Sequence, residues 1–307
     1  MKRTIKILSV IILLSVLLLT ACKPVTPQTY TDSLQREVTL LQPAQKIVSL
    51  APSNTELLFA IGAGSQVVGR DDFSDYPAEA AQLPSVGGSM GDYNLEAIVA
   101  LQPDLVLLSE LNSSDLVQSL ENLGLKVYYL GNPVEIEGLY TNLENLGKIT
   151  GHEADAASLI ESLKAKVSKV DELIATTSTR PLVFYELDAT EPTKPWTAGP
   201  GTFVDQLITR AGGENLGGSL DGAWVQISQE ALIINDPEII VMGDSIYGIT
   251  AEQVAERAGW ENLKAVTDGQ IYPFDDDLVS RPGPRLVDGL IELARIIHPE
   301  IADQLPK

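Results

Sequence analysis

Short apolar runs alternate with amphipathic segments along most of the chain. The apolar runs predict buried strands, at residues 46–50, 66–69, 104–108, 126–130, 182–185, 238–242 and 270–274. The amphipathic segments predict helices, at residues 52–61, 94–101, 115–123, 202–211, 228–234, 250–258 and 286–297. Ser53 and Glu56 have the spacing of a capping box at the start of the first helix. This alternation indicates an α/β fold with mostly parallel sheets.

One helical segment is longer than the others. Residues 152–174 contain no Gly or Pro, and apolar residues recur at helical spacing, at Ala156, Leu159, Ile160, Leu163, Val167, Val170, Leu173 and Ile174. A helix of about 23 residues spans roughly 35 Å. We interpret it as a rigid backbone helix that joins two Rossmann-like lobes, and the alternative is a helix packed on one larger sheet. The predicted division is a signal peptide at 1–21, a lipidated cysteine and tether at 22–43, an N-terminal lobe at 44–150, the connecting helix at 151–177 and a C-terminal lobe at 178–307.

An internal repeat supports two related lobes. Residues 96–108 and 230–242 align without a gap at an offset of 134 residues. In each segment a short helix begins with a glutamate, ends at a proline and leads into an apolar strand. Pro103 and Pro237 end the helices because the residue before a proline disfavours the α region. A cleft between two such lobes is a natural ligand site.

The glutamates that begin the repeats, Glu96 and Glu230, allow two compatible interpretations. Asn94 and Ser228 are suitable N-caps, so each glutamate falls in a first helical turn, where the dipole favours a carboxylate by about 0.3–1 kcal/mol. Alternatively, two equivalent carboxylates, one on each lobe, dock arginines of a two-fold symmetric membrane partner through charge-assisted hydrogen bonds.

The first 22 residues predict a secretion signal that ends in a lipobox. Lys2, Arg3 and Lys6 precede a mostly apolar run at residues 7–19, and small residues stand just before Cys22. The run is shorter than the about 20 residues of a membrane span. The alternatives are an ordinary cleaved signal or a membrane-anchor helix. Cys22 is the only cysteine, which excludes an intramolecular disulfide and a cysteine zinc cluster.

The chain is strongly acidic, with 42 Asp and Glu against 21 Lys and Arg and a formal charge of −21. Cleavage before Cys22 removes three basic residues and takes the formal charge to −24. Such a surface repels nucleic acid and anionic lipid headgroups. It argues against a strongly anionic ligand unless a local basic cluster overrides the field, although solubility alone explains much of the charge.

Several segments resemble one family. The two-lobe layout and residues 46–59, 75–77, 93–98 and 281–285 are similar to the iron-complex and vitamin B12 class of periplasmic binding proteins, in which a single backbone helix joins the lobes. The resemblance covers residues 30–305, and the vitamin B12-binding proteins are its nearest members. It implies a stiff, monomeric, extracytoplasmic protein, lipid-anchored through Cys22, that delivers cobalamin or a related corrinoid to an ABC permease dimer with a cytoplasmic ATPase. It implies no cofactor, no metal site and no catalytic residue, and ferric siderophore or haem binding is the alternative within the class.

The resemblance also implies roles for individual residues. Glu96 and Glu230 match the glutamates that bind arginine pockets on the permease. The positions that match the ligand cleft are Phe73, Trp196, Trp224, Asp277 and Arg281. Where the vitamin B12-binding proteins have a tryptophan, this chain has the loop 87–93, in which Met90 or Tyr93 takes the place. Independently of the resemblance, the tryptophans stand near Gly and Pro loops, where they either contact a flat macrocycle or anchor the loop in the core, the latter interpretation being stronger for Trp260.

An enzyme is the rival class of function. Ser89 lies in a G-x-S-x-G pattern, and His298 follows in the order of an α/β-hydrolase. A nucleophile elbow needs a strand that leads directly into a helix, and Pro84 interrupts that approach. We therefore keep a secreted serine hydrolase as a remote alternative.

Other ligands would need residues that are scarce in this chain. A zinc or manganese receptor uses several histidines, and the chain has two. Haem held by a tyrosine would use Tyr93 or Tyr247. Anionic siderophores would need cleft arginines, and the candidates are Arg70, Arg281 and Arg285. The run 275–277 of three aspartates fits a solvated turn better than a cation site.

Overall fold

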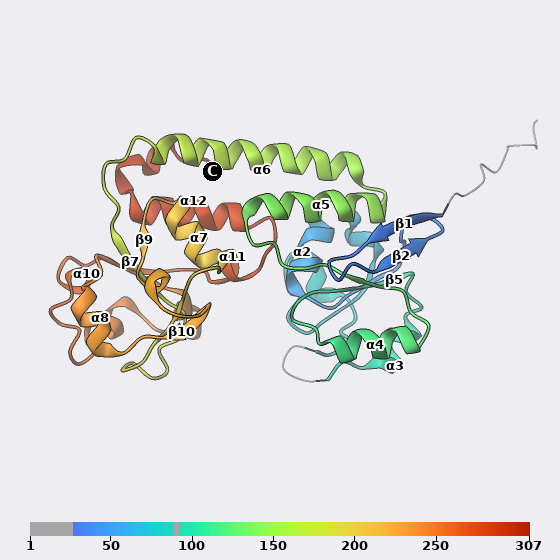
Figure 1. Ribbon diagram of the computed structural model, residues 1–307, viewed down its shortest axis with the longest axis horizontal. Helices are drawn as coiled ribbons and strands as arrows, with labels where there is room; N and C mark the ends of the chain where they lie inside the picture. The colour runs from blue at the N-terminus through green and yellow to red at the C-terminus, as the bar shows by residue number, and fades with distance from the viewer. Residues whose placement is uncertain (1–26, 89–91) are drawn as a thin grey trace, which may run out of the picture.

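The computed structural model describes residues 27–88 and 92–307. Two α/β lobes lie side by side, and the long helix α6 (Glu153–Ile174) spans both of them (Figure 1). This arrangement confirms the predicted fold class. The signal peptide, Cys22, Ser89 and Met90 lie outside the described residues. Within the described ranges, no helix has the length and apolar character of a membrane span.

The N-terminal lobe is built on a parallel sheet with strand order β4-β3-β5-β6. The strands are β3 (Ile47–Ser49), β4 (Val67–Arg70), β5 (Leu105–Leu108) and β6 (Val127–Tyr129). The helices of this lobe are α2 (Pro52–Ala60), α3 (Leu95–Ala100), α4 (Ser114–Asn122) and α5 (Ile136–Thr150). The sequence predicts every one of these elements except α5.

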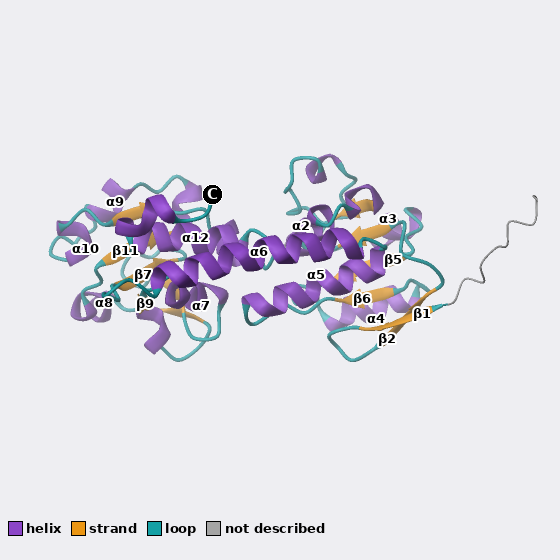
Figure 2. Cartoon of the chain, turned by 90° about the horizontal axis from the view of Figure 1, so that it is seen from above, coloured by secondary structure: helices purple, strands orange, loops and turns teal. Residues whose placement is uncertain are grey.

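Helix α5 runs antiparallel to α6 and packs along it (Figure 2). It contains two glycines, which weaken its local helical preference. Gly147 allows the close approach of the two helices, because a Cβ atom there would lie 2.8 Å from the Cβ atom of Ala156. Helix α5 ends at Gly151, whose φ of 81° is in the left-handed region that glycine adopts easily.

Residues 28–40 form a hairpin, so the prediction of a tether up to residue 43 is wrong for this segment. Strands β1 (Gln28–Thr31) and β2 (Glu37–Leu40) pair antiparallel. Val38 and Leu40 alternate with exposed residues and are buried in the core of the N-terminal lobe. The amide of Ser33 also donates to the carbonyl of Tyr129 at 3.0 Å. This apolar alternation is the strand signal that the tether interpretation missed.

The C-terminal lobe has a second parallel sheet, with strand order β12-β11-β7-β9. Its strands are β7 (Leu182–Glu186), β9 (Glu214–Asn215), β11 (Ile239–Met242) and β12 (Ile271–Pro273), and β8 (Trp196–Ala198) and β10 (Trp224–Gln226) form a separate antiparallel ribbon. Its helices are α7 (Phe203–Arg210), α8 (Gln229–Asn235), α9 (Ala251–Ala255), α10 (Lys264–Thr267), α11 (Asp277–Ser280) and α12 (Leu286–Ile297). The 3₁₀ helix η4 (Gly243–Tyr247) follows β11.

The apolar face of α6 joins the cores of both lobes. Of the predicted stripe, all residues are buried except Leu159, which is half-buried. Helix α6 packs against α5 in the N-terminal lobe and against α12 in the C-terminal lobe. One cluster of buried side chains therefore runs from Ile47 and Leu57, through Leu163 and Val170, to Val183.

We expect the two lobes to unfold in one cooperative transition because they share this cluster. The three tryptophans lie in the C-terminal lobe, so their fluorescence monitors that lobe, whereas far-UV circular dichroism monitors both. Urea curves from the two probes should coincide. Leu163→Ala should shift both curves equally and lower the free energy of unfolding by about 2–5 kcal/mol, while the control Glu161→Ala should shift neither. A separate second transition in circular dichroism would contradict the shared core.

Candidate functional site

A cavity of about 760 Å³ opens at the carboxyl ends of the N-terminal strands. Ligands of open parallel sheets bind at this edge. The residues that line the cavity come from the segments after β3, β4 and β5, and include Leu50, Asp71, Phe73, Tyr93, Leu111 and Asn112. The cavity thus contains two of the predicted ligand residues, Phe73 and Tyr93.

The side chain of Phe73 is exposed, whereas that of Tyr93 is fixed by hydrogen bonds. Phe73 is 52% exposed, so its side chain is available for contact. The hydroxyl of Tyr93 donates to the carbonyl of Leu50 at 3.1 Å and accepts from the amide of Asn112 at 2.8 Å. Its ring lies on the backbone of Gly88, where a Cβ atom would lie 2.2 Å from a ring atom. Tyr93 is therefore a fixed wall of the cavity.

Trp196 and Trp224 lie together on the ribbon of β8 and β10. Trp196 pairs with Gln226 and Trp224 pairs with Ala198, which makes the two tryptophans diagonal neighbours on one face of the ribbon. They are 39% and 48% exposed, whereas Trp260 is fully buried. The alternative that these tryptophans anchor loops in the core is thus wrong for Trp196 and Trp224 and correct for Trp260.

A group of ion pairs, here called the interlobe bridge, joins the lobes. It consists of Glu56 and Asp75 from the N-terminal lobe and Asp277, Arg281 and Arg285 from the C-terminal lobe. Arg285 donates to both carboxylate oxygens of Glu56, with Nε–Oε2 2.9 Å and Nη2–Oε1 2.5 Å. Arg281 donates to Asp75 through Nη1 at 2.6 Å and pairs with Asp277 through Nε at 2.8 Å.

Glu56 has a different role from the one its spacing predicts. Helix α2 has Ala51 as its N-cap and no side-chain cap, so the capping box between Ser53 and Glu56 is wrong. Glu56 is instead 3% exposed and pairs with Arg285. The carboxylate of Glu56 thus accepts from the guanidinium of Arg285, in the other lobe, and not from a backbone amide at the start of its own helix. The sequence analysis did not identify Glu56 as an interlobe residue.

Burial and charge act in opposite directions on these carboxyls. Burial raises the pKa of Glu56, and the two guanidiniums offset only part of that effect. Burial also raises the pKa of Asp277. For Asp75, burial is outweighed by the hydrogen bond and charge of Arg281, so its pKa is lowered. The bridge holds three carboxyls and two guanidiniums, so both arginines are compensated within it.

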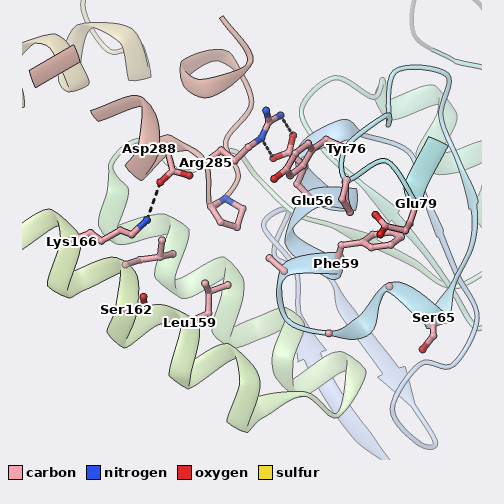
Figure 3. Close-up of a pocket in the computed structure, with 16 residues that line it drawn as sticks. Glu56, Phe59, Ser65, Tyr76, Glu79, Leu159, Ser162, Lys166, Arg285 and Asp288 are labelled. Atoms are coloured by element: carbon pink, nitrogen blue, oxygen red, sulfur yellow. Dashed lines mark hydrogen bonds and ion pairs between the residues drawn. The ribbon is translucent and has the colours of Figure 1, made fainter. Parts of the chain in front are cut away.

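A second cavity, of about 690 Å³, lies on the α6 side of the interlobe bridge (Figure 3). Phe59, Tyr76 and Leu159 line it, and Lys166 reaches across to Asp288 at 3.1 Å. Figure 3 shows the carboxylate of Glu56 facing the guanidinium of Arg285 at its wall. The predicted aromatic ligand residues do not line this cavity, so the cavity at the carboxyl ends of the strands is the better candidate site.

Acidic side chains dominate the carboxyl ends of the C-terminal strands. Glu186 ends β7, is fully buried and pairs with Arg257, and burial raises its pKa to about 7. Asp244 follows β11, accepts from the amide of Ala189 at 3.1 Å and has a pKa raised by burial. Asp276 accepts from the hydroxyl of Tyr185 at 2.6 Å. Across residues 27–88 and 92–307, no three His, Cys, Asp or Glu side chains are grouped to hold a metal ion.

Arg70 and His298, two further candidate residues, are bound to other groups of the protein. The guanidinium of Arg70 donates to the carbonyls of Asp71, Asp72 and Ala81. His298 is buried at the end of α12, with Nδ1 3.0 Å from Glu300 and Nε2 3.2 Å from the carbonyl of Gly212. Neither ring nitrogen of His298 is open to a substrate.

Glu96 and Glu230 occupy equivalent places on the two lobes. Asn94 and Ser228 cap their helices by accepting from Ala97 and Ala231, which confirms the predicted N-caps. Both glutamates are exposed, and in the described part of the chain their side chains form no hydrogen bond or ion pair. Helices α3 and α8 lie on the side of the lobes away from α6 (Figure 1).

Comparison with known proteins agrees with this architecture. A family model described as periplasmic binding protein matches residues 47–278. An uncharacterized ABC transporter substrate-binding lipoprotein of Bacillus subtilis is 33% identical over 279 residues, which cover 90% of this chain and 87% of that protein. A cobalamin-binding protein of Halobacterium salinarum is 29% identical, with 89% of this chain and 74% of that protein covered. A possible iron-binding periplasmic protein from Staphylococcus epidermidis has a TM-score of 0.73 at 28% identity, with 84% of this chain and 100% of that chain covered.

We expect Glu56→Gln to lower the free energy of unfolding by about 3 kcal/mol, because the largely buried guanidinium of Arg285 loses the carboxylate that accepts two of its hydrogen bonds. Urea denaturation measures the change. Glu292→Gln, which breaks a half-exposed pair with Arg295, is the matched control and should cost less than about 1 kcal/mol. The double variant Glu56→Met/Arg285→Met should recover much of the loss. Equal effects of Glu56→Gln and the control would show that the interlobe bridge adds no more to stability than a half-exposed ion pair.

Proposed function

This chain belongs to the periplasmic binding protein family, and we propose that it captures cobalamin or a related corrinoid between its lobes and delivers it to an ABC importer. The observation that carries the proposal is a pair of accessible aromatic sets, one on each lobe. Phe73 and Tyr93 line the N-terminal cavity, and Trp196 and Trp224 share one face of the C-terminal ribbon. Rigid aromatic side chains suit contact with a broad, flat macrocycle.

The charges near the cleft support a ligand without strong negative charge. Arg281 and Arg285 are compensated by three carboxyls in the interlobe bridge, and Arg70 is bound to backbone carbonyls. The strand ends of the C-terminal lobe add further buried acids, Glu186 and Asp244. An anionic ligand would therefore meet few free donors. A corrinoid with neutral amide side chains fits better than a ligand that carries several carboxylates.

An iron chelate is the second candidate, and haem is its most specific form. Tyr247 ends η4 and is 79% exposed, so its hydroxyl is open to a ligand. Tyr93 is less suitable as an iron ligand because its hydroxyl already has two partners. The iron-binding description of the Staphylococcus epidermidis structure is consistent with this candidate.

We assign partners by the same reasoning. Glu96 and Glu230 dock the two subunits of the permease, since they are exposed, equivalent in the repeat and without an intramolecular partner among the described residues. The permease works with a cytoplasmic ATPase. Lipid on Cys22 holds the protein at the outer face of the membrane, as the lipoprotein name of the Bacillus subtilis relative suggests. The protein acts as a monomer and turns over no substrate.

We expect cyanocobalamin to bind the chain from residue 23 onward at sub-micromolar concentration, measured by tryptophan fluorescence and calorimetry. Trp196→Ala and Trp224→Ala should each weaken binding at least about tenfold, because each removes a large contact surface. Leu41→Ala, a change at an exposed apolar residue next to β2, is the control and should leave binding unchanged.

Haem and a panel of ferric siderophores are titrated in parallel. A haem response that Tyr247→Phe abolishes, without a cobalamin response, would replace the corrinoid with haem and keep the transport role. A response to siderophores alone would assign an iron chelate. No response to any of the three would contradict the aromatic site itself.

A further inference from the structure

Helices α3 and α8, which carry Glu96 and Glu230, each have an exposed apolar residue close to the glutamate. Val99 lies three positions after Glu96 in α3, and Ile233 lies three positions after Glu230 in α8. Residues three apart are neighbours on one helix face. Val99 is 41% exposed and Ile233 is 42% exposed. The pairs Glu96–Val99 and Glu230–Ile233 are here called the two docking faces.

Both docking faces are held in the same local geometry. The residue before each exposed apolar one, Ile98 or Leu232, is fully buried and fixes the helix on its lobe. The chain leaves each helix through a residue with positive φ, Gln102 at 50° and Asp236 at 47°, although neither is glycine. Each of the two helices thus begins at a side-chain N-cap and is followed by a non-glycine residue in the left-handed region.

A single exposed apolar residue needs no explanation, because protein surfaces contain many. The repetition is what carries information here. An exposed β-branched residue next to an unpartnered glutamate occurs at the same repeat position on both lobes. A two-fold symmetric partner would contact the two positions equivalently. On α8 the next residue, Ile234, is 82% exposed and adds apolar area, where α3 has Ala100.

We propose that Val99 and Ile233 are apolar anchors of the contact with the permease dimer, each seated in an apolar hollow beside the basic group that receives the neighbouring glutamate. The inference rests on the proposed transport function and adds the chemistry of the partner's surface. Each permease subunit presents a basic residue and an apolar hollow within one side-chain length of each other. The glutamates supply charge steering, and the apolar anchors slow dissociation. Ile234 makes the C-terminal contact the larger of the two.

The test measures binding of the lipidated full chain, loaded with cyanocobalamin, to the host's permease–ATPase complex in nanodiscs. Val99→Thr and Ile233→Thr keep the branched shape and remove apolar character. Each should weaken binding about tenfold, since burial of such a side chain stabilises a contact by that order. Glu96→Gln and Glu230→Gln test the charged contacts in the same assay. Leu41→Thr is the matched control, because Leu41 is 63% exposed and lies outside the repeat.

The ionic strength of the assay distinguishes the charged contacts of the glutamates from the apolar contacts of Val99 and Ile233. Raising the ionic strength screens charge pairs on the surface, so the effect of the glutamate variants should shrink. The effect of Val99→Thr and Ile233→Thr should persist or grow. The affinity for cyanocobalamin, measured separately, should be the same in all variants.

Two outcomes would overturn the inference, and they differ. If the glutamate variants weaken binding but Val99→Thr and Ile233→Thr behave like Leu41→Thr, the apolar anchors are wrong and the docking glutamates stand. If the wild-type chain binds cyanocobalamin but does not bind the permease complex, the proposed docking fails together with the anchors.

Discussion

The arrangement of the molecule depends on the buried stripe of α6. Its side chains belong at once to the core of the N-terminal lobe and to that of the C-terminal lobe. A wide hinge needs a segment that few contacts cross, and α6 is continuous and packed along its length against α5 and then α12. Changes between the lobes are therefore restricted to small bending or shear. The distance between the two docking faces is restricted in the same way.

The interlobe bridge also restrains the two lobes relative to each other. Glu56 and Arg285 are 229 positions apart in the sequence, and their bidentate contact restrains orientation as well as distance. The stacking of Arg285 on the ring of Tyr76, at 4.0 Å, adds a second restraint. Arg281, another arginine that an anionic ligand could use, is held in the same bridge by Asp75 and Asp277. The ion pairs that restrain the lobes thus also neutralise guanidiniums at their interface.

The elements that the sequence predicts are those with strong local signals. The buried strands, the N-caps Asn94 and Ser228 and the stripe of α6 follow from apolar periodicity and capping chemistry. Helix α5 was missed because two glycines weaken a pattern that tertiary packing on α6 then stabilises. Glu56 was misassigned because its true partner lies in the other lobe, and one sequence cannot reveal such a contact. Met90 and Cys22 lie outside the described residues, so their roles remain predictions.

The two lobes are alike at helices α3 and α8 and different at the aromatic surfaces, which are the ribbon of β8 and β10 and the cavity that Phe73 and Tyr93 line. The N-caps, the buried anchors, the positive-φ exits and the exposed pairs all repeat at an offset of 134 residues. The aromatic surfaces do not repeat. The C-terminal lobe has the ribbon of β8 and β10, and the N-terminal lobe has a cavity with Tyr93 in its wall. The repeat is therefore kept at two surfaces that a two-fold symmetric partner would contact equivalently. It is lost at the aromatic surfaces, where an asymmetric ligand would need no repeat.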